Sequence, residues 1–260
     1  MKPENGHGSI ENTAAAGSES GRLALCSRLT AQMGAGFSSL LGIDLASAKS
    51  DEAFKWLLAC TVLGSCHQEK ATCAVYQDLE TANLVSTYRL LTTSWQSLMD
   101  ILDRSGRIKH SFSLAIGLPQ TAAALNAEYA GDLNRLHFFA RDERDLEKRL
   151  GKLSKAVTPA TVAPFLRGLR DLWEKANPPL AGDTLTASGR LGLTSSPNAT
   201  VALEELRMLW EDMAEDQLRF SDLEAALTRL GRDYCRKRRC HVCPVREECP
   251  NGARQPRLES

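Results

Sequence analysis

Apolar residues recur at three- and four-residue intervals along most of this chain, which is the spacing of one face of an α-helix. The clearest case is the run of Phe54, Leu57, Leu58, Thr61 and Val62. The same spacing predicts further helices over residues 68–79, 95–103, 111–129, 142–150, 160–175, 201–213 and 217–230. Alternating runs of β-branched residues, which indicate strands, are missing. The pattern therefore predicts an all-α fold.

The first twenty residues differ from the rest because they are small, polar and rich in glycine. Such a segment cannot bury enough apolar surface to offset the entropy lost on ordering, so we expect residues 1–20 to form a disordered tail. No apolar run is long enough to span a bilayer, and no segment has the charged and apolar parts of a signal peptide. We therefore expect an intracellular protein with no membrane role.

The charge of the chain is balanced overall but uneven along its length. Its 260 residues include 32 basic and 32 acidic side chains. From Arg229 to Arg257, however, nine lysines and arginines stand against three acidic residues, a local net charge of +6. A basic segment of this kind attracts phosphate groups, and its alternative interpretation is a solvated charged loop.

Four cysteines fall within this basic segment: Cys235, Cys240, Cys243 and Cys249, with the spacing C-x4-C-x2-C-x5-C. A loop this short cannot bury a core of its own, so the thiols are expected to hold it. Disulfides are disfavoured in an intracellular protein. Zinc remains possible, although structural zinc sites usually join two close pairs across a longer spacer. A [4Fe–4S] cluster takes four thiolates from one compact loop and fits the spacing better.

A second candidate site lies at residues 155–161, which read Lys-Ala-Val-Thr-Pro-Ala-Thr. Thr158 can cap a helix, and Pro159 suits the first helical position. A helix N-terminus presents free N–H groups and a positive dipole end, which together suit a phosphate. The residues alone are equally compatible with a turn between helices that binds nothing.

The cysteine segment, with Gly231 and Arg232 before it and Pro244 and Pro250 within it, resembles the cluster loop of the endonuclease III family of DNA glycosylases. That family usually spaces its cysteines C-x6-C-x2-C-x5-C, so the first interval here is two residues shorter. The resemblance implies a [4Fe–4S] cluster on the four cysteines. It also implies that the basic segment between the first two cysteines contacts DNA phosphates through Arg236, Lys237, Arg238 and Arg239.

The 155–161 segment resembles the helix-hairpin-helix of the same superfamily, whose hairpin reads Gly-apolar-Gly-Pro-x-Thr. This likeness implies DNA contact at Lys155, Ala156, Val157 and Thr158. Ala156 and Thr158 replace the two glycines, so we expect their Cβ atoms to hinder a phosphate and any positive φ to be strained. Near the start of the chain, Ser65 stands where many members carry a glutamine that fills the gap left by a flipped base.

The resemblance also bears on the chemistry. Ala160 occupies the position of the lysine that forms a Schiff base in bifunctional members, so amine-type lyase activity is not expected. The pair Asp183-Thr184 matches the family's catalytic Asp-Thr, which makes Asp183 the candidate catalytic residue. Aligning on Arg190 instead places Ala181 at that position, and a surface Asp-Thr turn is a further alternative.

The fold implied is two helical modules with a cleft: a six-helix barrel over 51–183, and a cluster module from 21–50 and 184–260. The function implied is a monofunctional DNA glycosylase that flips a damaged base out of double-stranded DNA. The alternatives are a DNA-binding iron–sulfur relative without glycosylase activity, and a redox or interaction protein that does not bind DNA. We expect a cytoplasmic monomer, associated with the nucleoid if the source is bacterial.

Overall fold

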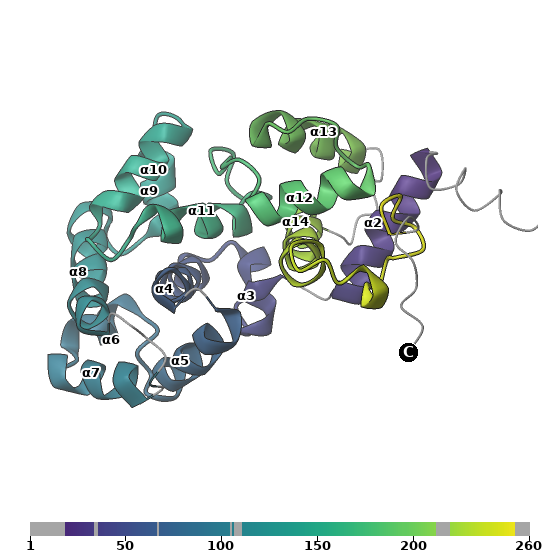
Figure 1. Cartoon of the computed structure of the whole chain (residues 1–260). Helices are drawn as coiled ribbons and strands as arrows, with labels where there is room; N and C mark the ends of the chain where they lie inside the picture. Colours follow the sequence, from purple (N-terminus) through teal and green to yellow (C-terminus); the bar gives the residue numbers. More distant parts are fainter. Residues whose placement is uncertain are drawn as a thin grey trace, which may run out of the picture. The chain divides into compact units, whose positions relative to one another are not determined.

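The structure is a computed structural model that describes residues 19–33, 36–66, 68–104, 106, 111–211 and 219–252. These residues form helices joined by turns and short loops, and they contain no strand (Figure 1). The predicted all-α fold is therefore confirmed. Most of the predicted disordered tail lies outside the described residues, and its last two positions begin the first described helix.

The chain divides into two compact units, each with its own core. The central unit is Phe37–Pro178, and the terminal unit combines Met1–Gly36 with Pro179–Ser260. The central unit thus begins ahead of residue 51, the boundary expected from the sequence, because Phe37 and Leu41 pack into its core. It ends earlier than expected because Leu180 packs into the core of the terminal unit.

The central unit is organised around one buried helix, α4. Its elements are α3 (Phe37–Leu40), η1 (Leu45–Ser47), α4 (Ser50–Cys66), α5 (Glu69–Thr81), α6 (Thr87–Thr92), α7 (Trp95–Arg104), α8 (Ser111–Tyr129), α9 (Leu133–Phe139), α10 (Glu143–Lys152) and α11 (Pro159–Gly168). Helix α4 packs against α5, α9 and α11. It is seen end-on in Figure 1, inside an arc made by the later helices. A helix with apolar residues on most of its sides is stable only in such a position.

The periodic pattern located most helices of the central unit closely. The bounds of α8 are those predicted, and α5, α7 and α10 begin and end within two residues of the predicted positions. The predicted helix 160–175 is wrong at its end, because α11 stops at Gly168. At that residue α11 lies so close to α4 that a Cβ atom would collide with the ring of Trp56, and the chain then turns.

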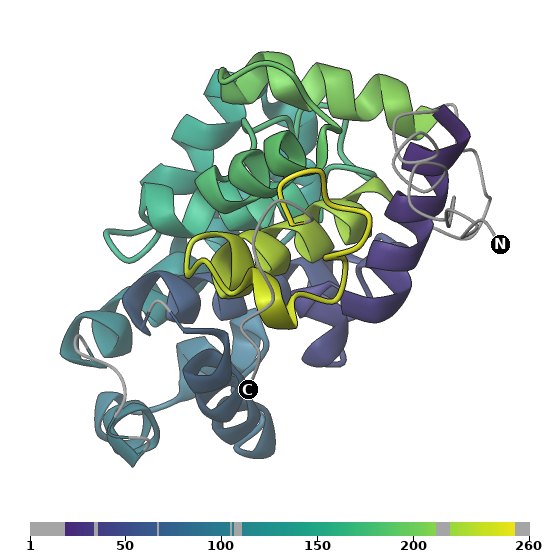
Figure 2. The ribbon, with the colours of Figure 1, turned by 45° about the vertical axis from the view of Figure 1, so that its right-hand side comes forward.

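The terminal unit brings together segments from both ends of the chain. It contains α2 (Glu19–Met33), α12 (Gly182–Leu191), α13 (Ala199–Glu211), α14 (Phe220–Leu230), the π-helical turn η2 (Gly231–Cys235) and the 3₁₀ turn η3 (Cys240–Val242). Helix α14 packs against α2 and α12, and η2 continues from its end (Figure 2). Of the predicted helices 201–213 and 217–230, residues 212–213 and 217–218 lie outside the described residues.

Membrane insertion was examined across the same residues. None of the described helices is both long enough and apolar enough to cross a bilayer.

The start of α10 is fixed by a charged side chain whose effect on stability depends on pH. The carboxylate of Asp145 accepts hydrogen bonds from the backbone N–H of Arg141 (3.0 Å) and from Nε of Arg149 (2.9 Å). These bonds lower the pKa of Asp145 to about 2. A carboxyl whose pKa is depressed on folding stabilises the folded state above its unfolded pKa of about 3.9, and this contribution is lost as the pH falls through about 2.

We therefore expect Asp145→Asn to lower the melting temperature at pH 7, with the difference from the unmodified protein narrowing as the pH falls below about 4. Thermal melts followed by circular dichroism between pH 7 and pH 3 measure this difference. Asp103→Asn, at an exposed aspartate of α7, is the control. If the difference in melting temperature between Asp145→Asn and the unmodified protein stays constant over this pH range, the charge of the Asp145 carboxylate does not contribute to stability.

Candidate functional site

The four cysteines predicted as ligands come together in the terminal unit. All of them line one small pocket, with Arg190, Arg246 and Asn251 also in its wall. Cys235 is buried, the other three are partly buried, and all eight cysteines of the chain are free thiols. Convergence of four thiols on one pocket is the arrangement that an inorganic cofactor requires.

The geometry of the pocket is not that of a ready-made site for a single ion. Within the described residues, no group of three or more histidine, cysteine, aspartate or glutamate side chains is placed so that it could ligate one metal ion. The four thiols thus share a pocket without forming a compact tetrahedral shell around one point. Such a shell would need every sulfur at about 2.3 Å from a zinc ion.

Burial raises the pKa of two of these thiols, Cys235 and Cys243. Removal from water raises the pKa of Cys235 to about 11, an effect opposed by the nearby Arg190 cation and reinforced by the charges of the other three cysteines. Burial likewise raises the pKa of Cys243. Without a cofactor both therefore stay protonated at neutral pH. Binding of a metal or cluster has to displace these protons, since thiolates are the ligands.

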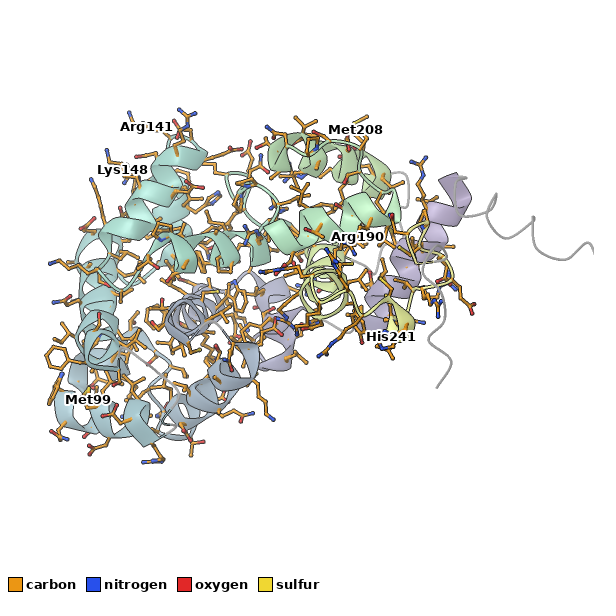
Figure 3. The ribbon with its side chains drawn as sticks, viewed as in Figure 1. Met99, Arg141, Lys148, Arg190, Met208 and His241 are labelled. Carbon is orange, nitrogen blue, oxygen red and sulfur yellow. The ribbon has the colours of Figure 1, made fainter. Side chains whose placement is uncertain are left out.

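Arg190, in the last turn of α12, ties the cysteine loop to the helical core. Its guanidinium Nη1 donates to the carbonyl oxygen of Cys235 at 3.1 Å. Its own carbonyl oxygen accepts from Nδ2 of Asn251 at 2.9 Å and from Sγ of Cys249 at 3.6 Å. In Figure 3 its side chain points from α12 towards the C-terminal segment. One residue therefore fixes both ends of the loop and brings a positive charge to the thiols.

The basic segment that follows Cys235 is exposed at all four positions, Arg236, Lys237, Arg238 and Arg239. It begins where η2 ends, through bonds from the Arg238 N–H to Cys235 O (3.3 Å) and from the Arg239 N–H to Tyr234 O (3.0 Å). Arg238 is left-handed, with φ 54°. This is a Schellman-type ending, which usually has glycine at the left-handed position. Because the chain reverses sharply at this turn, the four residues between Cys235 and Cys240 are enough to bring Cys240 back to the pocket.

The candidate catalytic residue lies beside this segment. Asp183 is in the first turn of α12, and its Oδ1 lies 3.1 Å from Nη1 of Arg236. The Asp183 side chain is 18% exposed and that of Arg236 is 67% exposed, so the ion pair is open to solvent on the arginine side. The predicted catalytic carboxylate and a predicted phosphate-binding cation are therefore in direct contact. The interpretation of Asp183-Thr184 as part of a surface turn is replaced by a helical position.

Close packing of α12 against η2 makes this contact possible. A Cβ atom on Gly231 would overlap the carbonyl group of Asp183. The glycine is thus needed because two backbones meet, and not because of its φ. Sequence analysis placed Gly231 in the cluster motif without finding this reason.

Replacing Gly231 with alanine should consequently destabilise the terminal unit by about 1–3 kcal/mol, the usual cost of overpacking. Gly189→Ala is a matched control within α12, because nothing lies within 4 Å of the Cβ position there. That change should stabilise the helix by up to about 1 kcal/mol. Urea denaturation of both variants measures the two effects, and equal midpoints would contradict the packing argument.

The hairpin residues predicted to contact DNA lie in the central unit, between α10 and α11. Thr158 is the N-cap of α11 and Pro159 its first residue, as the sequence suggested, although the Thr158 side chain makes no capping bond. Lys155 and Thr158 are exposed, whereas the Val157 side chain is only 4% exposed and packs in the core. The side chain of Val157 is therefore an anchor and not a surface contact.

The condition under which we expected strain at Ala156 and Thr158, a positive φ, is not met. Neither Ala156 nor Thr158 has a positive φ, and the φ of Thr158 is −94°. The Cβ atom of Ala156 fills the space left by Gly117 of α8, where a second Cβ would collide with it. The substitution at 156 is therefore compensated on a neighbouring helix.

Backbone N–H groups of the hairpin are already used within it. Ala156 donates to Ser154 Oγ (3.2 Å), Val157 to Ser154 O (3.2 Å) and Thr158 to Ala156 O (3.1 Å). These are the groups that the family hairpin would turn towards a phosphate. A phosphate contact here therefore rests on the exposed Lys155 and on side-chain hydroxyls.

Ser65 lies in the last turn of α4. Its hydroxyl donates to the carbonyl oxygen of Thr61 at 3.2 Å. The preceding Gly64 is in contact range of Thr161 in α11. The end of α4, where Ser65 lies, is thus close to the start of α11.

Two residues of the candidate site, Arg190 and Asn251, were not predicted from the sequence. Arg190 was noted only as an alignment anchor, and Asn251 was not singled out. Neither could have been found from spacing, because their roles depend on α12 meeting the loop. Comparison of the chain with protein-family models and with curated proteins finds no match.

Proposed function

We propose that this protein binds double-stranded DNA, carries a [4Fe–4S] cluster in its cysteine loop, and hydrolyses the N-glycosidic bond of a flipped, damaged base. The observation that carries the proposal is the meeting of three features in one unit. The four cysteines line one pocket, an exposed basic segment leaves that pocket, and Arg236 of the segment contacts Asp183.

Cys235, Cys240, Cys243 and Cys249 would hold the cluster. In a [4Fe–4S] cluster each iron takes one cysteine, so the sulfurs can lie further apart than the ligands of a single ion. The ligand type and the spacing of the four cysteines are the reasons for proposing a cluster in place of zinc. Arg190 would offset the negative charge of four thiolates. When bound, the cluster supplies metal–thiolate bonds that hold the loop in one conformation.

The basic segment supplies the affinity for DNA. Arg236, Lys237, Arg238 and Arg239 would neutralise backbone phosphates and release counterions, a contribution that is independent of base sequence. Lys155 and Thr158 of the hairpin would add phosphate contacts from the central unit. Two of the cations are already paired, Arg236 with Asp183 and Lys237 with Asp233 (3.5 Å). Because these ion pairs break when DNA replaces the carboxylates, the two cations contribute less free energy to DNA binding.

Asp183 would act on the flipped nucleotide. As the bond between the sugar C1′ and the base breaks, positive charge develops on the sugar, and a nearby carboxylate stabilises it. A water molecule adds to C1′, and a proton passes to the departing base. In the free protein Arg236 neutralises Asp183. A DNA phosphate that draws Arg236 away would leave the carboxylate unbalanced beside its substrate.

A DNA-binding protein without glycosylase activity is the second candidate, and one observation favours it. Asp183 is occupied by an ion pair at 3.1 Å, and Ala160 provides no amine for lyase chemistry. On this interpretation Asp183 serves only to position Arg236.

An assay of base release separates the two candidates. Purified protein is incubated with duplexes that contain damaged, mismatched or alkylated bases, and Asp183→Asn is tested beside it. We expect release of a free base by the unmodified protein and none by the variant. Duplex binding of the variant should stay equal or tighten by up to about fivefold, because Arg236 loses its partner.

Tight duplex binding without release of any base would support the non-catalytic alternative. Release by Asp183→Asn at the full rate would remove Asp183 from the mechanism. Absence of duplex binding would overturn both candidates.

A further inference from the structure

The outer face of α10 carries a row of cations that the proposed function does not use. Arg144, Lys148 and Lys152 follow one another at four-residue intervals, opposite the buried Leu146 and Leu150. All three are exposed. Figure 3 shows the side chain of Lys148 standing away from the helix. We call these three residues the α10 stripe.

Four acidic side chains lie on α10 or at its start, and three of them have partners outside the stripe: Asp142 caps the N-terminus of α10, Glu143 accepts from Asn177, and Asp145 pairs with Arg149. The fourth, Glu147, is exposed between Arg144 and Lys148 in the sequence, and no ion pair joins it to either residue in the described part of the chain. Arg144, Lys148 and Lys152 form no ion pair in that part of the chain. Three cations on one uninterrupted face attract a linear polyanion more strongly than scattered surface charges.

Two exposed aromatic rings stand at the N-terminal end of the stripe. Phe138 and Phe139, at the end of α9, are 76% and 47% exposed. Their rings meet edge to face with centroids 5.6 Å apart. Together the two rings form a small exposed apolar patch beside α10, and an aromatic face of this kind can stack on a nucleobase. Because α9 packs on α10 and only three residues separate the two helices, the rings lie close to the N-terminal end of α10, where the stripe begins.

We propose that the α10 stripe with Phe138 binds single-stranded nucleic acid. Successive stripe residues rise by about 6 Å along the helix axis, so adjacent side chains can reach successive phosphates of an extended strand. Phe138 would then stack on an unpaired base. A duplex offers phosphates but no free base faces, which is why the aromatic pair favours a single strand.

This surface is separate from the basic segment at the cysteine loop, and its role does not depend on glycosylase activity. Single-stranded DNA and RNA share the chemistry that the surface would recognise. Oligothymidine and oligouridine of equal length therefore serve as the two probes, and the corresponding DNA duplex serves as a third.

The test measures fluorescence anisotropy of labelled probes with the full chain, at several salt concentrations. The triple change Arg144→Gln, Lys148→Gln, Lys152→Gln should weaken single-strand binding and reduce the salt slope by about 2, since each phosphate contact contributes about 0.7. Phe138→Ala should weaken single-strand binding at least about fivefold and leave the slope unchanged. Duplex binding should change far less in both cases.

Matched controls lie in the same unit. Lys70→Gln, Arg89→Gln, Arg104→Gln removes three exposed cations elsewhere, and Phe112→Ala removes another exposed ring. Both controls should bind single strands normally. The proposal is overturned if the control triple loses as much affinity as the stripe triple, if Phe138→Ala has no effect, or if only the duplex responds. A variant with Arg236–Arg239 changed to glutamine tests the two surfaces separately. We expect it to lose duplex binding and to keep single-strand binding, because the α10 stripe is unchanged.

Discussion

Replacing Cys240 with serine is expected to abolish binding of iron by this protein. Purified without oxygen, the unmodified chain should be brown, absorb near roughly 400 nm as iron–sulfur proteins do, and contain about four irons per chain. A serine oxygen is a poor substitute for a thiolate at iron. Because the four cysteines line one pocket, losing one should release the whole cluster and not a quarter of it.

Cys73→Ser is the matched control for this experiment, since Cys73 is a partly buried cysteine of the central unit with no place in the pocket. It should leave iron content and colour unchanged. Iron and zinc analysis of the same samples distinguishes an iron–sulfur cluster from a zinc site. A colourless protein that contains one zinc per chain, and loses it in Cys240→Ser, would show that the site binds zinc and not a cluster. Unmodified protein without any metal would show that the site holds no cofactor.

Loading of this site should also depend on pH. Burial holds the pKa values of Cys235 and Cys243 above their ordinary range, so these thiols are protonated in the empty loop. Bound as thiolates, they have lost their protons. Cofactor binding therefore releases protons and strengthens as pH rises. Arg190 makes the loss of the Cys235 proton easier, because its cation favours the thiolate of Cys235.

Spacing located most of the longer helices but did not single out α6, α9 or α12. In α4 and α8 large apolar residues recur with the helical period, so both helices could be found from spacing alone. Helix α12 was not predicted. Its buried side chains are mostly small, Thr184, Ala187 and Ser188, and give little hydrophobic signal. It exists because α14 and η2 pack against it, which no local pattern reveals.

The candidate site divides in the same way. The cysteines could be found because all four lie close together in the sequence. The contact of Asp183 with Arg236 could not, since 53 residues separate them. The space that holds the Cβ atom of Ala156 could not be predicted either, because Gly117, which leaves that space, lies on another helix. Spacing in the sequence can identify candidate site residues that lie within one segment. Contacts between residues of different segments depend on how the helices pack, which spacing does not reveal.

Removing the charges of the basic segment should have the largest effect on DNA binding. The variant Arg236→Gln, Lys237→Gln, Arg238→Gln, Arg239→Gln is expected to bind duplex DNA on the order of a hundredfold more weakly at moderate salt. If all four cations contact phosphates, the salt slope falls by about 3.6, at about 0.9 per contact. Because Arg236 and Lys237 give up Asp183 and Asp233 on binding, the affinity they contribute is smaller than that of Arg238 and Arg239.

A charge-retaining variant, Arg236→Lys, Arg238→Lys, Arg239→Lys, separates charge from shape. If phosphate attraction drives binding, it should keep nearly all of the affinity and salt dependence, since lysine binds phosphate as a point charge. Anisotropy titrations of one duplex at several salt concentrations measure both quantities, with iron content and helix content checked for each variant. A glutamine variant with an unchanged slope would show that the segment does not lie along DNA. A slope reduced equally in the lysine variant would show that bidentate guanidinium geometry matters more than charge.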